Sequence, residues 1–159
     1  MLSESVKESW KINTRINLNL LGHLSSDMLV AQSSGSGHTV AQHLVHMIDA
    51  LKFWGQLFDK PRFSTIPDLA DPQVEAIVPI ADLDLATLRK VMEESRDLAL
   101  EAADVDKDKG KLPYHSIETF LIHIIAHDSH HRGQIVLALK AGGHPLPEDS
   151  AIWSPWRIG

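Results

Sequence analysis

Apolar residues recur at helical intervals along four stretches of the chain, which predicts four amphipathic helices. The first is predicted over residues 3–32 and the second over 39–57, where Thr39 and Gln42 have the spacing of a capping box. The third is predicted over 84–102 and the fourth over 116–140. The residues expected in the core of the first three helices are Val6, Trp10, Leu20, Leu21, Leu24, Met28, Val40, Leu44, Met47, Leu51, Trp54, Phe58, Leu85, Leu88, Met92, Leu98 and Leu100.

The segments between these stretches contain residues that break helices. Residues 33–37 read SSGSG, residues 59–82 contain four prolines, and residues 104–113 form a charged loop. Gly142 and Gly143 stop the fourth helix, and the tail is too short for another long helix. No segment shows the alternation expected of a sheet. The pattern predicts an all-α four-helix bundle that forms one domain over residues 1–159.

Charge and composition exclude several classes of partner. The formal charge is −6, with 21 acidic and 15 basic residues, which argues against nucleic acid binding. No apolar run is long enough to span a bilayer, and the polar start MLSESVKESW does not resemble a secretory signal. We therefore expect a cytoplasmic protein with no membrane partner. The chain has no cysteine but ten histidines, so a metal would be bound through nitrogen and oxygen atoms.

Histidines cluster in the fourth predicted helix. His127 and His131 are four residues apart and share a face with Phe120, Ile124, Gln134 and Ala138, which is the face expected to point inward. Two such imidazoles can bind one cation, but a stable site needs another ligand from a neighbouring helix. His43 and His46 in the second helix could each supply it, and spacing alone does not choose between them. His123 also lies four residues before His127, which permits a shifted set.

Residues 127–131 read HDSHH and differ from the metalloprotease motif HExxH by Asp128 in place of glutamate. Asp128 is one methylene shorter and lies about 100° from His127 around a helix. We expect it to point away from a metal and to pair with Arg132, four residues later. A protease function is therefore disfavoured.

Two stretches together resemble the DinB family, the DinB/YfiT-like metalloenzymes of bacteria. They are TVAQHLVHMIDALKFW over residues 39–54 and LIHIIAHDSHHRGQIVLALKAGG over residues 121–143, of which the second is more specific. The stretch SWKINTRINLNLL, with Asn17, and the late WSPW are also similar to the family pattern. The resemblance extends over nearly the whole chain.

The resemblance implies a four-helix bundle in up-down-down-up order that binds a divalent metal, with zinc or nickel the expected ions. Carried over by position, the metal ligands are His46, His127 and His131. The resemblance places His43 and His123 beside the ligands without binding the ion. His130, Asp128 and Arg132 are further residues expected near them. The family is commonly dimeric, which implies a homodimer.

Three neutral imidazoles leave a divalent ion its full charge and an open coordination position, which is typical of a catalytic site. Some proteins similar in fold and ligand set are thiol S-transferases or thiol-dependent isomerases. The expected function is therefore a metal-dependent transferase acting on a small thiol and an electrophile. Two alternatives are a metal-dependent hydrolase and a non-catalytic metal-binding module of a stress response. A metal-free bundle with packed histidines is a further possibility.

Overall fold

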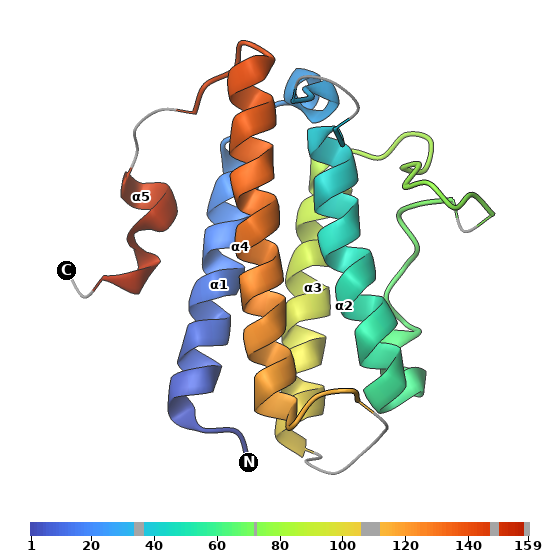
Figure 1. The fold of residues 1–159 in the computed structure, drawn as a ribbon, viewed down its shortest axis with the longest axis vertical. Helices are drawn as coiled ribbons and strands as arrows, with labels where there is room; N and C mark the ends of the chain where they lie inside the picture. Colours follow the sequence, from blue (N-terminus) through green and yellow to red (C-terminus); the bar gives the residue numbers. More distant parts are fainter. Residues whose placement is uncertain (34–36, 72, 106–111, 147–149, 158–159) are drawn as a thin grey trace.

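A computed structural model describes residues 1–33, 37–71, 73–105, 112–146 and 150–157 of the chain. Its four long helices are α1 (Glu4–Gly22), α2 (Val40–Phe63), α3 (Leu85–Val105) and α4 (Ile117–Ala141), packed side by side as a bundle (Figure 1). Three short elements are η1 (Ser26–Val30), α5 (Ser150–Trp153) and η2 (Ser154–Trp156), of which α5 and η2 lie against α1. The predicted all-α bundle is confirmed.

The helices run up, down, down and up, as the family resemblance implied (Figure 1). The connection over residues 64–71 and 73–84 returns along the outside of the bundle, so α3 runs in the same direction as α2 (Figure 1). Its prolines prevent a fifth long helix there. As a result α4 lies beside α2 and runs antiparallel to it, and these two helices carry the histidines.

The core consists of the apolar faces of all four helices. Most of the expected core residues are buried, and they are joined by Phe63, Phe120, Leu121 and Ile135. Six of the expected residues are only partly buried at the edge of this core: Val6, Met28, Trp54, Leu85, Leu98 and Leu100. The helical spacing therefore predicted the direction of the buried faces.

The first helix is shorter than predicted, because α1 ends at Gly22 rather than near residue 32. The amide of His23 closes the last turn on Leu20 and Leu21. Ser25 then donates its hydroxyl hydrogen to Asp27, at 2.5 Å, and the chain continues as the separate 3₁₀ helix η1. Serine and aspartate side chains compete for local hydrogen bonds in this way, and the apolar periodicity that continues through Met28 concealed the break.

The second helix begins as predicted and ends later. Thr39 and Gln42 form the capping box. The helix extends to Phe63 rather than Leu57, with a kink at Asp59, whose φ and ψ are −139° and 80°. The Asp59 carboxylate accepts a hydrogen bond from the Arg62 amide at 3.3 Å and so starts a short second segment. Proline is tolerated in a first turn, which explains why Pro61 lies within this element.

The fourth helix has nearly the predicted bounds. Ser116 caps its start by accepting a hydrogen bond from the Thr119 amide, and Gly142 follows its last residue. The expected turn at 33–37 and loop at 104–113 lie partly outside the described residues, since 34–36 and 106–111 are not described. None of the helices in the described part of the chain combines the length and apolar composition needed to cross a membrane.

Candidate metal centre

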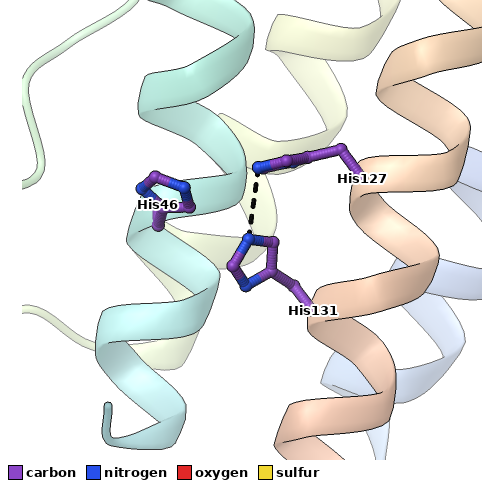
Figure 2. A group of neighbouring side chains, drawn as sticks. All are labelled: His46, His127 and His131. Carbon is purple, nitrogen blue, oxygen red and sulfur yellow. Dashed lines mark hydrogen bonds between the residues drawn. The ribbon is translucent and has the colours of Figure 1, made fainter. Parts of the chain in front are cut away.

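Three histidines from the two antiparallel helices α2 and α4 converge at the middle of the bundle. His46 on α2 faces His127 and His131 on α4, and the three rings point toward one another (Figure 2). One ring nitrogen from each residue lies within 4.8 Å of the others. We call His46, His127 and His131 the histidine triad. Of the candidates in the second helix, the structure thus groups His46, and not His43, with the pair on α4.

The two α4 members of the histidine triad have the separation that a shared ion requires. The Nε2 atoms of His127 and His131 are 3.2 Å apart. Two nitrogen ligands at 2.0–2.1 Å from one tetrahedral ion are about 3.3 Å apart. The donor set is therefore geometrically suited to a divalent ion, and its chemistry suits zinc, nickel, copper or iron.

Burial keeps the three imidazoles of the histidine triad neutral near pH 7. Desolvation is the main cause that lowers the pKa of His131 to about 3 and that of His127 to about 4. The pKa of His46 is also lowered, mainly by burial. A neutral imidazole has the free lone pair that a metal ligand needs, so near pH 7 none of the three must first release a proton.

Two further histidines contact His131. The Nδ1 atom of His43 lies 3.0 Å from Nδ1 of His131, whose other ring nitrogen, Nε2, contacts His127. His130 is exposed, and its ring stands edge-on to His131 with the centroids 5.1 Å apart. Both lie beside the histidine triad, as expected, and His43 is the one that is hydrogen-bonded to it.

His123 connects the histidine triad to an aromatic strip, which we define as Phe53, Trp54 and Tyr114. The ring of His123 lies 6.3 Å from that of His127, and its Nδ1 atom is hydrogen-bonded to the Tyr114 hydroxyl at 2.6 Å. Tyr114 contacts Trp54, which contacts Phe53, and Phe53 is 59% exposed. His123 is exposed and is not grouped with the triad. One side of the site is therefore aromatic.

Asp128 points into the bundle, away from the histidine triad. One carboxylate oxygen forms an ion pair with Arg96 of α3 at 2.8 Å, and both side chains are fully buried. The other accepts hydrogen bonds from the side-chain amides of Asn13 and Asn17 of α1, each at 2.8 Å. Asp128 was expected to point away from a metal and to pair with Arg132, and its carboxylate is instead bound by Arg96, Asn13 and Asn17.

Arg132 also differs from the sequence prediction, because it reaches Asp128 through asparagines rather than directly. Its Nη1 atom donates to the side-chain oxygens of Asn13 and Asn17, whose amide groups donate to Asp128. The two asparagines on α1 have the same four-residue spacing as Asp128 and Arg132 on α4. Both buried side chains are thereby hydrogen-bonded, as buried polar groups usually are. We call these four residues and Arg96 the buried polar network.

Arg96 and Tyr114 are residues of this region that were not predicted from the sequence. Arg96 lies on the same stripe of α3 as Leu88 and Met92, and this four-residue spacing indicated an inward position. A second Nη2 hydrogen bond, to the backbone oxygen of Met47 at 3.1 Å, joins it to α2, one residue after His46. Tyr114 comes before α4, and no periodic pattern pointed to it. The network therefore ties all four helices together at the level of the triad.

Comparison with known proteins agrees with this arrangement. The sequence model of the DinB family matches residues 2–157, a range that includes the four helices and the histidine triad. Comparisons with curated proteins and with solved structures found no match. A family match over nearly the whole length, on an all-helical bundle with three convergent histidines, leads to one conclusion: the chain belongs to the DinB family.

Proposed function

We propose that this protein binds one divalent ion through His46, His127 and His131 and works as a metal-dependent transferase of the thiol S-transferase type. The observation that carries the proposal is the convergence of three neutral imidazoles within 4.8 Å. Asp128, the carboxylate next to His127 in sequence, is bound to Arg96 and so leaves the ion's charge unopposed. Three uncharged ligands and an open position characterise catalytic sites.

The expected ion is zinc or nickel. Bound there, it would supply positive charge that lowers the pKa of a thiol or water molecule in the open position. The roles of the chain itself are to hold the three imidazoles, to keep them uncharged by burial, and to maintain the spacing of α2 and α4 through the buried polar network.

The thiol must come from a second substrate, because the chain has no cysteine. In the proposed reaction the sulfur of a small thiol forms a bond to an electrophilic carbon. The leaving group departs from that carbon with its bonding electron pair, and the thiol proton passes to solvent. The aromatic strip supports an electrophile with an apolar or aromatic body, since exposed Phe53 and the adjoining Trp54 offer flat apolar surface on one side of the site.

The experiment begins with protein purified without a nickel column, stripped of metal and reloaded with zinc or nickel. One equivalent of ion should bind to the wild type and to His115→Ala, which changes an exposed histidine outside the site. His46→Ala, His127→Ala and His131→Ala should each lose stoichiometric binding. Full metal content in His131→Ala would contradict the assignment of the triad.

Activity is then screened with a panel of small thiols and electrophiles. Turnover that needs both the ion and a thiol supports transfer. Metal-dependent turnover without a thiol would replace this proposal with a hydrolase, and stoichiometric metal with no turnover would favour a non-catalytic module. We further propose a cytoplasmic homodimer, for which light scattering should give twice the mass of one chain.

A further inference from the structure

The hydrogen bond between His43 and His131 can run in either direction, and the proposed role of His131 as a metal ligand determines which ring donates the proton. The Nδ1 atoms of His43 and His131 are 3.0 Å apart, and both side chains are buried. Two nitrogens at this distance share one proton, so one ring donates and the other accepts. Of the three triad members, only His131 has its outer nitrogen hydrogen-bonded within the described part of the chain, whereas Nδ1 of His127 is buried without a partner.

The two directions have opposite consequences for His131. A proton donated by His43 would leave neutral His131 protonated at Nε2, the atom 3.2 Å from Nε2 of His127, and no lone pair would face the triad. A proton donated by His131 leaves its Nε2 lone pair directed at the triad. Hydrogen bonds to the outer nitrogen commonly select the tautomer and ring orientation of a metal-binding histidine.

We propose that His43 is a positioning residue that accepts the Nδ1 proton of His131 and thereby holds the His131 Nε2 lone pair toward the metal. The inference rests on the proposed metal binding and adds a role for a histidine that does not touch the ion. His43 then carries its own proton on Nε2.

The surroundings of His43 suit this role. It lies in the first turn of α2, where its amide donates to the Thr39 carbonyl at 3.0 Å and the adjacent capping box fixes the backbone. The edge of the His38 ring packs against it, with centroids 5.5 Å apart. The backbone of α2 therefore holds the His43 imidazole in place. Its hydrogen bond to His131 then also fixes the orientation of the His131 ring on α4.

The test compares His43→Leu with His43→Asn. These side chains have similar size, but only asparagine offers an acceptor oxygen near the position of Nδ1. We expect His43→Leu to bind Co²⁺ or Zn²⁺ about 10- to 100-fold more weakly in a competition assay, as for other lost partners of metal ligands. His43→Asn should recover most of the affinity. Equal affinities of the Leu variant and the wild type, or of the two variants, would overturn the proposal.

The matched control is His130→Leu, which removes the other imidazole beside His131 but no hydrogen bond to it. Its affinity should remain near that of the wild type. Nitrogen-15 NMR reports which nitrogen of each imidazole carries the proton, and this property would not change if His43 only packed against His131. His131 should be protonated at Nδ1 in the wild type and should lose this preference in His43→Leu. A His131 protonated at Nε2 in the wild type overturns the proposal. A wild type that binds no ion would overturn the proposed metal binding itself. A wild type that binds an ion with the same affinity as His43→Leu would overturn only the role of His43, so the two failures are distinguishable.

Discussion

Arg96 and Asp128 form an ion pair with a 2.8 Å contact, and neither side chain is exposed to solvent. Removal of one partner of a buried pair leaves the other charge uncompensated and typically costs about 3–5 kcal/mol. We expect Asp128→Asn to lower the free energy of unfolding by this amount, because Arg96 and Arg132 would then lack their common anion. Urea denaturation measures the change.

The control for this variant is Glu94→Gln. Glu94 lies on α3 and makes an exposed pair with Lys90 at 4.0 Å. Exposed pairs contribute about 1 kcal/mol or less. Equal losses in the two variants would show that the buried charge is compensated in another way.

A divalent ion should stabilise the protein through the histidine triad. Binding to the folded state alone adds about 2.7 kcal/mol when the free ion is at 100 times its Kd. Zinc should therefore raise the Tm of the wild type by several degrees, and His46→Ala should abolish the shift. The Tm without metal should change little in this variant, because His46 is only half-buried. A zinc shift that persists without His46 would mean that the ion binds elsewhere.

Acid should destabilise the metal-free protein below about pH 6.5. Burial lowers the pKa of His43, His127 and His131 to between about 3 and 4, while the unfolded chain takes up protons near 6.5. Each of these imidazoles should therefore cost about 1–2 kcal/mol between pH 7.5 and 5, and the loss should level off below pH 3. Asp49 opposes this trend, since burial raises its pKa to about 6.

Urea unfolding at several pH values checks this window. Asp49→Asn removes the opposing proton uptake and should make the loss steeper between pH 6 and 4. Stability that stays constant from pH 7.5 to 5 would mean that the histidines are charged in the folded protein.

Gly55→Ala should be strongly destabilising. The kink at Asp59 returns Phe63 to Gly55, where a Cβ would lie 2.0 Å from the ring. Phe63 is fully buried and cannot move without disturbing the core. Overpacking of this kind costs about 1–3 kcal/mol or more. The matched variant Gly133→Ala places its Cβ in open space and should leave the Tm unchanged or slightly raised.

Phe53→Ala tests the aromatic strip once a reaction is known. The KM for an aromatic electrophile should rise about 5- to 30-fold, because loss of apolar contact weakens binding by roughly 1–2 kcal/mol. The KM for a small polar electrophile should change little. Leu137→Ala, which removes a similarly exposed apolar side chain elsewhere on the surface, serves as the control. Equal effects on both electrophiles would exclude Phe53 from the substrate site.

Local patterns predicted the parts of the fold that local interactions determine. The capping box at Thr39, the inward face of α4 and the pairing of His127 with His131 follow from spacings of three or four residues, and the start of α4 was expected near Ser116. The resemblance to a family, rather than spacing, selected His46 over His43. The structure groups His46 with the pair on α4, because its ring centroid lies 5.2 Å from that of His127 and 4.8 Å from that of His131.

Contacts between distant segments could not be predicted in the same way. Asn13 and Asn17 are four residues apart on α1, but the Asp128 carboxylate that both of them bind lies more than 100 positions away in the chain. The spacing of Asp128 and Arg132 favoured a direct pair, and only the packing of α1 against α4 inserts two asparagines between them. The end of α1 was not predicted, because apolar residues continue at helical spacing through the 3₁₀ helix η1 after α1 has ended.

The path of the chain also determines when the site can exist. His43 and His131 are 88 positions apart, with the outer connection and all of α3 between them. A nascent polypeptide that has not yet reached α4 holds only His46 of the histidine triad and would lack the other two proposed ligands. Metal uptake at the proposed site would therefore require that α4 has been synthesised and has packed against α2.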